Sequence, residues 1–182
     1  MPNLSWARFV EKIGRLPGAR IPLADLTRLV RDLQLTRDFI APHLNGCPDS
    51  YTRNPVHRCE KLEALVLCWE DGQETVVHDH GPSCSVAKVW SGSTKLENFR
   101  RDDKGERPGF ARLAVTESLN LTAGDVCESE VGSIHAMGNS QGGRRRMVTV
   151  NFYSPPLTRI STCERSTGRI GERSYPALLA TF

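Results

Sequence analysis

The sequence lacks any long hydrophobic run. None of its apolar stretches approaches the roughly 20 residues that are needed to span a membrane. Charged residues interrupt residues 1–12 too early for them to form the apolar core of a signal peptide. These absences favour a cytoplasmic protein with no membrane partner.

Cysteine pairs are lacking as well. The six cysteines include no Cys-x-x-Cys pair, and in a reducing compartment they stay as free thiols. We therefore expect no disulfide framework, because a chain of 182 residues can bury a stable core without one.

The sequence also has little excess of charge. The formal net charge is +3, from 24 Lys and Arg against 21 Asp and Glu, which is too small to indicate a nucleic-acid partner. The basic run 144–146 follows turn residues at 141–143, so we interpret it as the solvated flank of a hairpin. We expect a soluble monomer that binds no nucleic acid.

The chain falls into a helical and a strand-rich part. Residues 1–45 are predicted to be helical, with Ser5 as a suitable N-cap, a second helix from near Pro22 and a short third from Thr36. From Tyr51 onward, many short runs typical of strands predict a sandwich or small barrel. The predicted strands are 64–69, 75–80, 85–90, 95–99, 111–116, 125–129, 133–137 and 147–153.

A single domain over residues 1–182 follows from this pattern. Its parts are the helical segment 1–45, a β-barrel core at 46–157, and residues 158–182 as a C-terminal hairpin or a loosely ordered tail. We interpret the apolar helix faces as surfaces that pack on the barrel.

Two histidines have the spacing of half a metal site. Residues two apart on a strand point to the same side, so His78 and His80 present two imidazoles on one face. A third imidazole must come from elsewhere. With five histidines in the chain, the candidates are His43, His57 and His135.

Two stretches resemble the cupin motifs. Residues 72–92 resemble the first motif, G-x5-H-x-H-x(3,4)-E-x6-G, except that its glutamate is missing. Residues 124–139 resemble the second, G-x5-P-x-G-x2-H-x3-N, except that Glu130 replaces the proline. The resemblance implies a mainly β fold, the cupin double-stranded β-helix or jelly-roll barrel, with the N-terminal helices packed outside. It also implies one metal held by His78, His80 and His135.

Three further patterns resemble the thiol dioxygenases, and specifically the cysteine dioxygenase family. They are Tyr51-Thr52-Arg53-Asn54, Leu67-Cys68-Trp69 and Tyr153-Ser154-Pro155-Pro156. The resemblance implies oxidation of L-cysteine by O2 to cysteine sulfinic acid. Three neutral imidazoles leave a metal its full double charge and open positions for substrates. Zinc also tolerates three histidines, so Fe(2+) is implied by the family and not by the ligands.

The resemblance also implies roles for residues around the metal. The family's carboxylate clamp falls on Tyr51 and Arg53, and a guanidinium can bond a carboxylate in two places. Relatives that use mercaptopropionate often carry glutamine at the arginine position, so Arg53 favours L-cysteine. Tyr153 is the expected catalytic phenol, and the expected supporting residues are Thr149, Asn151 and Trp69.

The sequence departs from the family at two points. Asn151 stands where the family has the histidine of a Ser-x-His-x-Tyr relay, and it cannot titrate near neutral pH. Ser85 occupies the position of the cysteine that forms a thioether with the active-site tyrosine in some members. Cys84, one residue earlier, should face away, so we expect no cross-link to Tyr153.

Two alternatives stay open. One is a dioxygenase for another small thiol, such as 3-mercaptopropionate or cysteamine. The other is a non-catalytic cupin that binds a metal or a small acid, which Asn151 keeps open because a step that needs a proton along the relay is in doubt.

Overall fold

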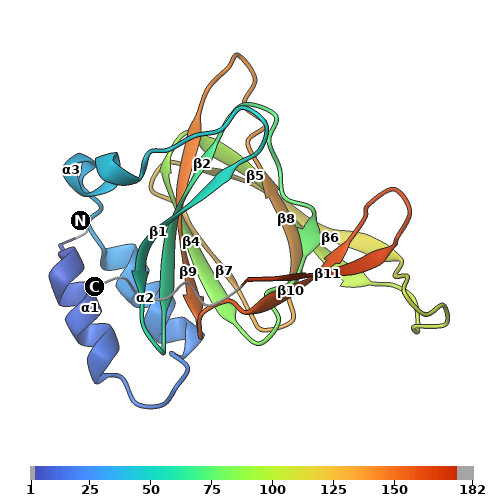
Figure 1. Cartoon of the computed structure of the whole chain (residues 1–182), viewed down its shortest axis with the longest axis horizontal. Helices are drawn as coiled ribbons and strands as arrows, with labels where there is room; N and C mark the ends of the chain where they lie inside the picture. The colour runs from blue at the N-terminus through green and yellow to red at the C-terminus, as the bar shows by residue number, and fades with distance from the viewer. Residues whose placement is uncertain (1–2, 176–182) are drawn as a thin grey trace.

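The computed structural model describes residues 3–175, so residues 1–2 of the expected helical segment and 176–182 of the expected hairpin or tail lie outside the described residues. Two antiparallel sheets face each other as a barrel (Figure 1). One sheet has the order β1-β2-β9-β4-β7 and the other β11-β10-β3-β8-β5-β6. The mainly β class predicted from the sequence is confirmed.

The helices are α1 (Trp6–Arg15), α2 (Leu23–Asp32) and α3 (Arg37–Ile40), with a short 3-10 turn, η1 (Ala41–His43), after them. The strands are β1 (Thr52–Arg58), β2 (Glu63–Trp69), β3 (Val77–His78), β4 (Cys84–Ser91), β5 (Ser93–Arg101), β6 (Leu113–Thr122), β7 (Val126–Ser129), β8 (Ile134–Gly138), β9 (Met147–Ser154), β10 (Arg159–Cys163) and β11 (Ile170–Ser174). Within residues 3–175, none of the helices is long and apolar enough to cross a membrane.

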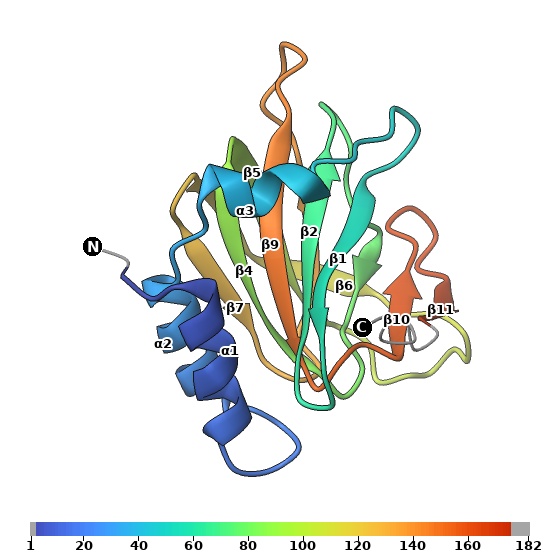
Figure 2. The ribbon, with the colours of Figure 1, turned by 60° about the vertical axis from the view of Figure 1, so that its left-hand side comes forward.

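The helices pack on the outer face of the five-stranded sheet, as predicted (Figure 2). Helix α1 buries Phe9 and Ile13, and the Phe9 ring lies 5.4 Å from the ring of Phe152 on β9. Since successive side chains of a strand point to opposite faces, Tyr153 beside Phe152 points into the barrel. The burial of β9 along its whole length follows from these two packed faces.

Three strand predictions need correction. The predicted strand 75–80 is too long, because β3 covers only Val77–His78. After it, the carboxylate of Asp79 accepts hydrogen bonds from the backbone N–H groups of Gly81 and Ser161, both at 2.9 Å, which turns the chain. The predicted strand 111–116 begins and ends too early, because β6 covers Leu113–Thr122.

Strand β1 was not predicted. It contains Pro55, which cannot donate a backbone hydrogen bond, and it lies at a sheet edge, where proline is tolerated.

A buried lysine joins α2 to the sheet. Lys88 of β4 is 8% exposed, and its Nζ donates to the carbonyl oxygens of Val30, Arg31 and Leu33 at 3.1, 3.2 and 2.8 Å. These carbonyls lie at the C-terminal end of α2, where the last helical carbonyls lack an i+4 donor. That of Val30 also accepts from the backbone N–H of Leu33 at 3.3 Å. Burial lowers the pKa of Lys88. The amine therefore satisfies backbone acceptors that the packed helix end hides from water.

We predict that Lys88→Met destabilises the fold. The carbonyl oxygens of Arg31 and Leu33 would lose the Lys88 donor, while that of Val30 keeps the backbone N–H of Leu33, so the free energy of unfolding should fall by about 2 kcal/mol. Urea denaturation measures this loss. Lys104→Met removes an exposed amine and serves as the control. Equal stability of the two variants would contradict the role given to Lys88.

Candidate metal centre and substrate pocket

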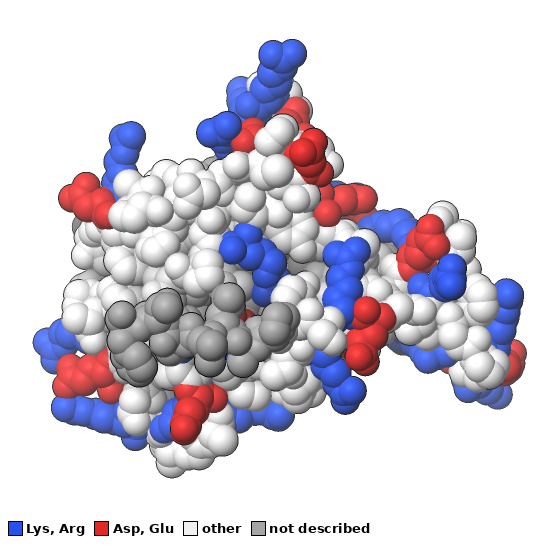
Figure 3. Space-filling model, in the orientation of Figure 1, with Lys and Arg blue, Asp and Glu red and all other residues white. Residues whose placement is uncertain are grey.

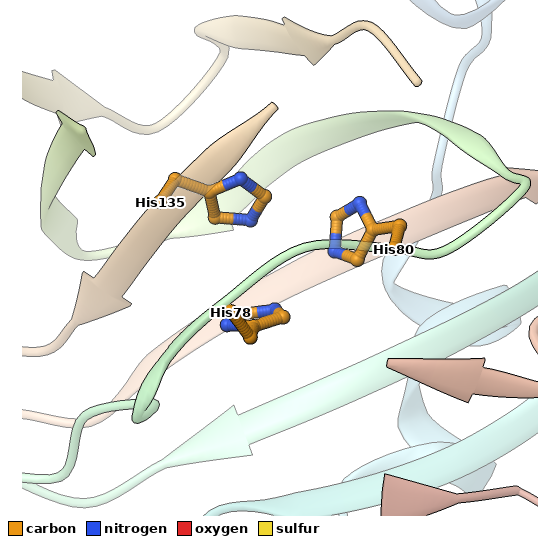
Figure 4. Close-up of side chains that lie close together, drawn as sticks. All are labelled: His78, His80 and His135. Atoms are coloured by element: carbon orange, nitrogen blue, oxygen red, sulfur yellow. The ribbon is translucent and has the colours of Figure 1, made fainter. Parts of the chain in front are cut away.

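Three histidines meet inside the barrel. His78 lies on β3, His80 follows that strand, and His135 lies on β8, where it is paired in register with His78. One ring nitrogen from each histidine lies within 4.8 Å of the others (Figure 4). The structure thus brings together the three histidines that the two motifs indicated as ligands. His43 lies apart on η1, and His57 is half-buried on the outer face, 6.1 Å from the ring of Trp6.

Burial keeps the three imidazoles neutral. It lowers the pKa of His78, and together with the neighbouring histidines it holds the pKa of His80 well below its usual value. Burial and the nearby His78 lower the pKa of His135 to about 3. Near neutral pH each ring is therefore neutral, and one of its two nitrogens has no proton and is free to bind a metal.

The donor set fits a divalent metal. A hydrogen bond of 2.9 Å joins Nδ1 of His78 to the carbonyl oxygen of Val76; with its proton on Nδ1, this ring has Nε2 free as a ligand atom. Among the described residues that line the surrounding pocket, none is an aspartate or a glutamate. Ser85 lines the pocket near the cluster, where the first cupin motif has its glutamate. The arrangement is a neutral three-nitrogen site.

An arginine faces the same pocket from β1. The guanidinium carbon of Arg53 lies 5.8 Å from the ring centroid of Tyr153 and 4.4 Å from that of Tyr175. Within residues 3–175, Arg53 takes part in no ion pair. Tyr51 stacks on Trp69 with ring centroids 4.3 Å apart. The pocket therefore holds a cation beside the histidines, and none of the described residues that line it is a carboxylate.

Tyr153 stands between the arginine and the histidines. Its ring is 3% exposed and packs edge-on against His80, with centroids 5.1 Å apart. Burial raises the pKa of Tyr153 to about 12. The side chain is thus a protonated phenol at neutral pH.

The residues behind Tyr153 do not form a continuous relay. The Thr149 hydroxyl accepts a hydrogen bond of 3.2 Å from Nε1 of Trp69. Asn151 lines the pocket, and its buried Oδ1 has no hydrogen-bond partner among the described residues. A proton could not pass from Tyr153 through Asn151 to Thr149.

Arg173 and Tyr175, a charged and a phenolic residue of the pocket, were not predicted from the sequence. Both come from the C-terminal hairpin, which the sequence left open between a hairpin and a tail. If residues 170–175 form a strand, Arg173 and Tyr175 lie on the same face, but the sequence does not show what that face contacts. The pairing of β10 with β11 and with β3 places it at the pocket.

Cys84 points away from this pocket. Its thiol donates to the carbonyl oxygens of Ile21, at 3.8 Å, and Ser154, at 3.4 Å, on the side of the N-terminal segment. Ser85 is the residue of β4 that lies opposite Tyr153 in the register and lines the pocket. The thiol and the phenol thus lie on opposite faces of the sheet.

Solved structures with the same fold define the class of protein. The chain is similar to a protein with a double-stranded β-helix domain from Klebsiella pneumoniae, with a TM-score of 0.52, 18% identity and coverage of 74% of this chain and 87% of that one. A Thermus thermophilus protein gives a TM-score of 0.51 at 16% identity, over 64% of this chain and 93% of its own. The fold is therefore the double-stranded β-helix that the motifs implied.

The family follows from sequence comparison. Residues 45–166 match the family model "Cysteine dioxygenase type I", so the chain belongs to that family. Cysteine dioxygenase type 1 of Rattus norvegicus is 28% identical over 125 residues, and that of Homo sapiens is 28% identical over 127; each match covers 68% of this chain. The matches span 59% of the length of these relatives.

We predict that the metal-free protein gains thermal stability when Fe(2+) or Co(2+) is added without oxygen. A ligand that binds only the folded state stabilises it, by about 3 kcal/mol at a hundred times its Kd. His80→Ala should abolish the gain, as followed by circular dichroism. His43→Ala, which removes a histidine outside the cluster, should keep it. An unchanged gain in His80→Ala would contradict the assigned ligands.

We also predict that the protein carries no thioether cross-link. Its intact mass should equal the mass of the sequence, because the Cys84 thiol faces away from Tyr153. Mass spectrometry of the purified protein and its tryptic peptides tests this. A mass lower by two hydrogens, with a linked Cys84 and Tyr153 peptide, would overturn the prediction.

Proposed function

We propose that the protein is a non-haem iron(II) thiol dioxygenase that oxidises L-cysteine with O2 to cysteine sulfinic acid. One observation carries the proposal: a buried cluster of three neutral histidines shares its pocket with an arginine that has no acidic partner within residues 3–175. Membership of the cysteine dioxygenase type I family supports this reaction class. His78, His80 and His135 would hold the ferrous ion.

When bound, such an ion supplies the redox chemistry that lets O2 react with a thiolate. The protein would position the substrate and keep water away from the reacting sulfur. The apolar pocket residues exclude water around the reacting sulfur, which strengthens each electrostatic contact inside. They are Leu67, Trp69, Ala87, Leu96, Met137, Leu157 and Ile160.

Arg53 would bind the substrate carboxylate. Its planar guanidinium can donate two parallel hydrogen bonds to one carboxylate, and the rings of Tyr153 and Tyr175 restrict the movement of the guanidinium. Tyr51, held by its stack on Trp69, would add a hydroxyl to this clamp. A substrate anchored at its carboxylate presents its thiol to the histidine cluster, so the reacting atoms meet in one orientation.

Tyr153 would orient the reacting sulfur. With a pKa raised to about 12, its Oη keeps its proton and can donate a hydrogen bond to a thiolate in the pocket. The phenol therefore stabilises negative charge on the sulfur without losing its own proton.

We expect oxygen consumption by the ferrous protein with L-cysteine, and Arg53→Ala should raise the KM for L-cysteine about 10- to 100-fold. That range corresponds to about 1.4 to 2.8 kcal/mol for a lost charge-assisted pair. Cysteamine lacks a carboxylate, so its KM should change little. An oxygen electrode measures both thiols, and Arg145→Ala in the exposed loop before β9 is the control.

Two outcomes would contradict the proposal in different ways. Equal KM values for L-cysteine in the wild type and Arg53→Ala would show that the enzyme does not recognise the carboxylate through Arg53. Absence of oxygen uptake with every small thiol, in a protein that binds Fe(2+), would favour a non-catalytic cupin.

A further inference from the structure

A serine on β7 lies within hydrogen-bond distance of one histidine of the cluster. The Oγ of Ser129 lies 3.4 Å from Nδ1 of His135. The ring of His135 has little access to water, because this residue is 5% exposed. Within residues 3–175, no other side chain is hydrogen-bonded to the His135 ring. The orientation of this ring therefore depends on one hydroxyl.

The turn between β7 and β8 brings the two side chains together. Ser129 is the last residue of β7 in one sheet, and His135 is the second residue of β8 in the other. The backbone N–H of Ser133 donates to the carbonyl oxygen of Glu130 at 3.1 Å, and Gly132 takes a φ of 81°, which glycine adopts without strain. This short connection carries the chain from one sheet to the other, so the hydroxyl and the ring face each other across it.

Strand pairing keeps the Ser129 hydroxyl on the inner face. Ser129 is paired in register with Ser85, and Ser85 is paired with Tyr153. Directly opposed residues share a face of the sheet, and all three line the pocket. His135 is held in the other sheet by its pairing with His78. Backbone hydrogen bonds thus fix the positions of both partners.

The contact leaves one ring nitrogen for a metal. A neutral imidazole has one nitrogen that donates a hydrogen bond and one that accepts. If Nδ1 of His135 carries the proton, it donates to Ser129 and leaves Nε2 unprotonated. His78 has the same arrangement, because its Nδ1 lies 2.9 Å from the carbonyl oxygen of Val76. Histidine ligands in proteins usually have such a partner on the nitrogen that does not bind the metal.

A hydroxyl is a neutral partner for the ring. Figure 3 shows acidic side chains scattered over the outer surface of the molecule, whereas none of the described residues that line the pocket is an aspartate or a glutamate. A carboxylate behind His135 would add a negative charge to the site. Ser129 can orient the ring without adding charge, which fits the neutral three-nitrogen site.

We infer that Ser129 is a positioning residue of the metal centre, whose hydroxyl accepts the Nδ1 proton of His135 and so presents Nε2 to the ion. This inference rests on the ligand set of the proposed function. A ring without this partner could carry its proton on either nitrogen and could rotate. Only part of the molecules would then be ready to bind the metal, and the apparent affinity would fall by that fraction.

The position of the proton can be measured without metal or substrate. Long-range 1H–15N correlation spectra of the metal-free protein, labelled with 15N at histidine, show which nitrogen of each ring is protonated. We expect Nδ1 of His135 to be protonated in the wild type and in Ser129→Thr, which keeps a hydroxyl, and the proton to move toward Nε2 in Ser129→Ala. His135→Asn identifies the signal among those of the five histidines. A proton on Nε2 in the wild type would overturn the inference, whether or not the variants fold.

The metal affinity should follow the same order. We expect Ser129→Ala to raise the Kd for Co(2+), added without oxygen, about tenfold and to shift the visible absorption of the bound ion, whereas Ser129→Thr should stay within about threefold of the wild type. Ser85→Ala is the matched control, because it removes the hydroxyl that lies opposite Ser129 in the register and lines the same pocket. Equal Kd values for the wild type and Ser129→Ala would contradict the positioning role.

The inference and the proposed function fail in different ways. If the protein binds Co(2+) more weakly in Ser129→Ala but the ferrous wild type oxidises no thiol, the proposed reaction fails and the positioning role stands. If thiols are oxidised while the Kd and the proton position do not depend on Ser129, only the inference fails.

Discussion

The charge balance of the barrel interior governs the site. Three neutral imidazoles, two arginines and no carboxylate among the described lining residues leave the pocket with positive charge, which a divalent metal would increase. Unpaired charge in a partly buried site is unfavourable unless an anion joins it. Such a pocket favours ligands that carry negative charge. A carboxylate in place of Ser85 would offset part of the positive charge.

Strand β4, which lies between β9 and β7, sets this arrangement. Its inward residue Ser85 is paired with Tyr153 on one side and with Ser129 on the other, and Ala87 is likewise paired with Asn151 and Cys127. The outward residues between them pack against the helices. A slip of β9 by one residue would turn Tyr153 outward and bring Phe152 to the pocket side. Packing of α1 and α2 thus holds the register on which the site depends.

Local spacing explains what could be predicted from the sequence. His78, His80 and His135 lie within motifs whose spacing reflects the turns and strands around them, so the cluster follows from the motifs even though β3 is shorter than expected. Arg173 and Tyr175 have no such motif. Their position depends on the pairing of Thr162 with His78, a contact between residues distant in the chain. Periodicity predicts which face of a strand a side chain lies on, but it does not predict which other strand pairs with that strand.

Asn151 separates Tyr153 from any proton relay along β9. Burial raises the pKa of Tyr153 to about 12, and the neighbouring Asn151 side chain lowers it by less. The buried amide oxygen of Asn151 has no hydrogen-bond partner among the described residues, which costs about 1 to 3 kcal/mol. A histidine at this position could gain and lose a proton near neutral pH, whereas the amide of Asn151 cannot, so the pocket has no titrating group on β9 beside the phenol.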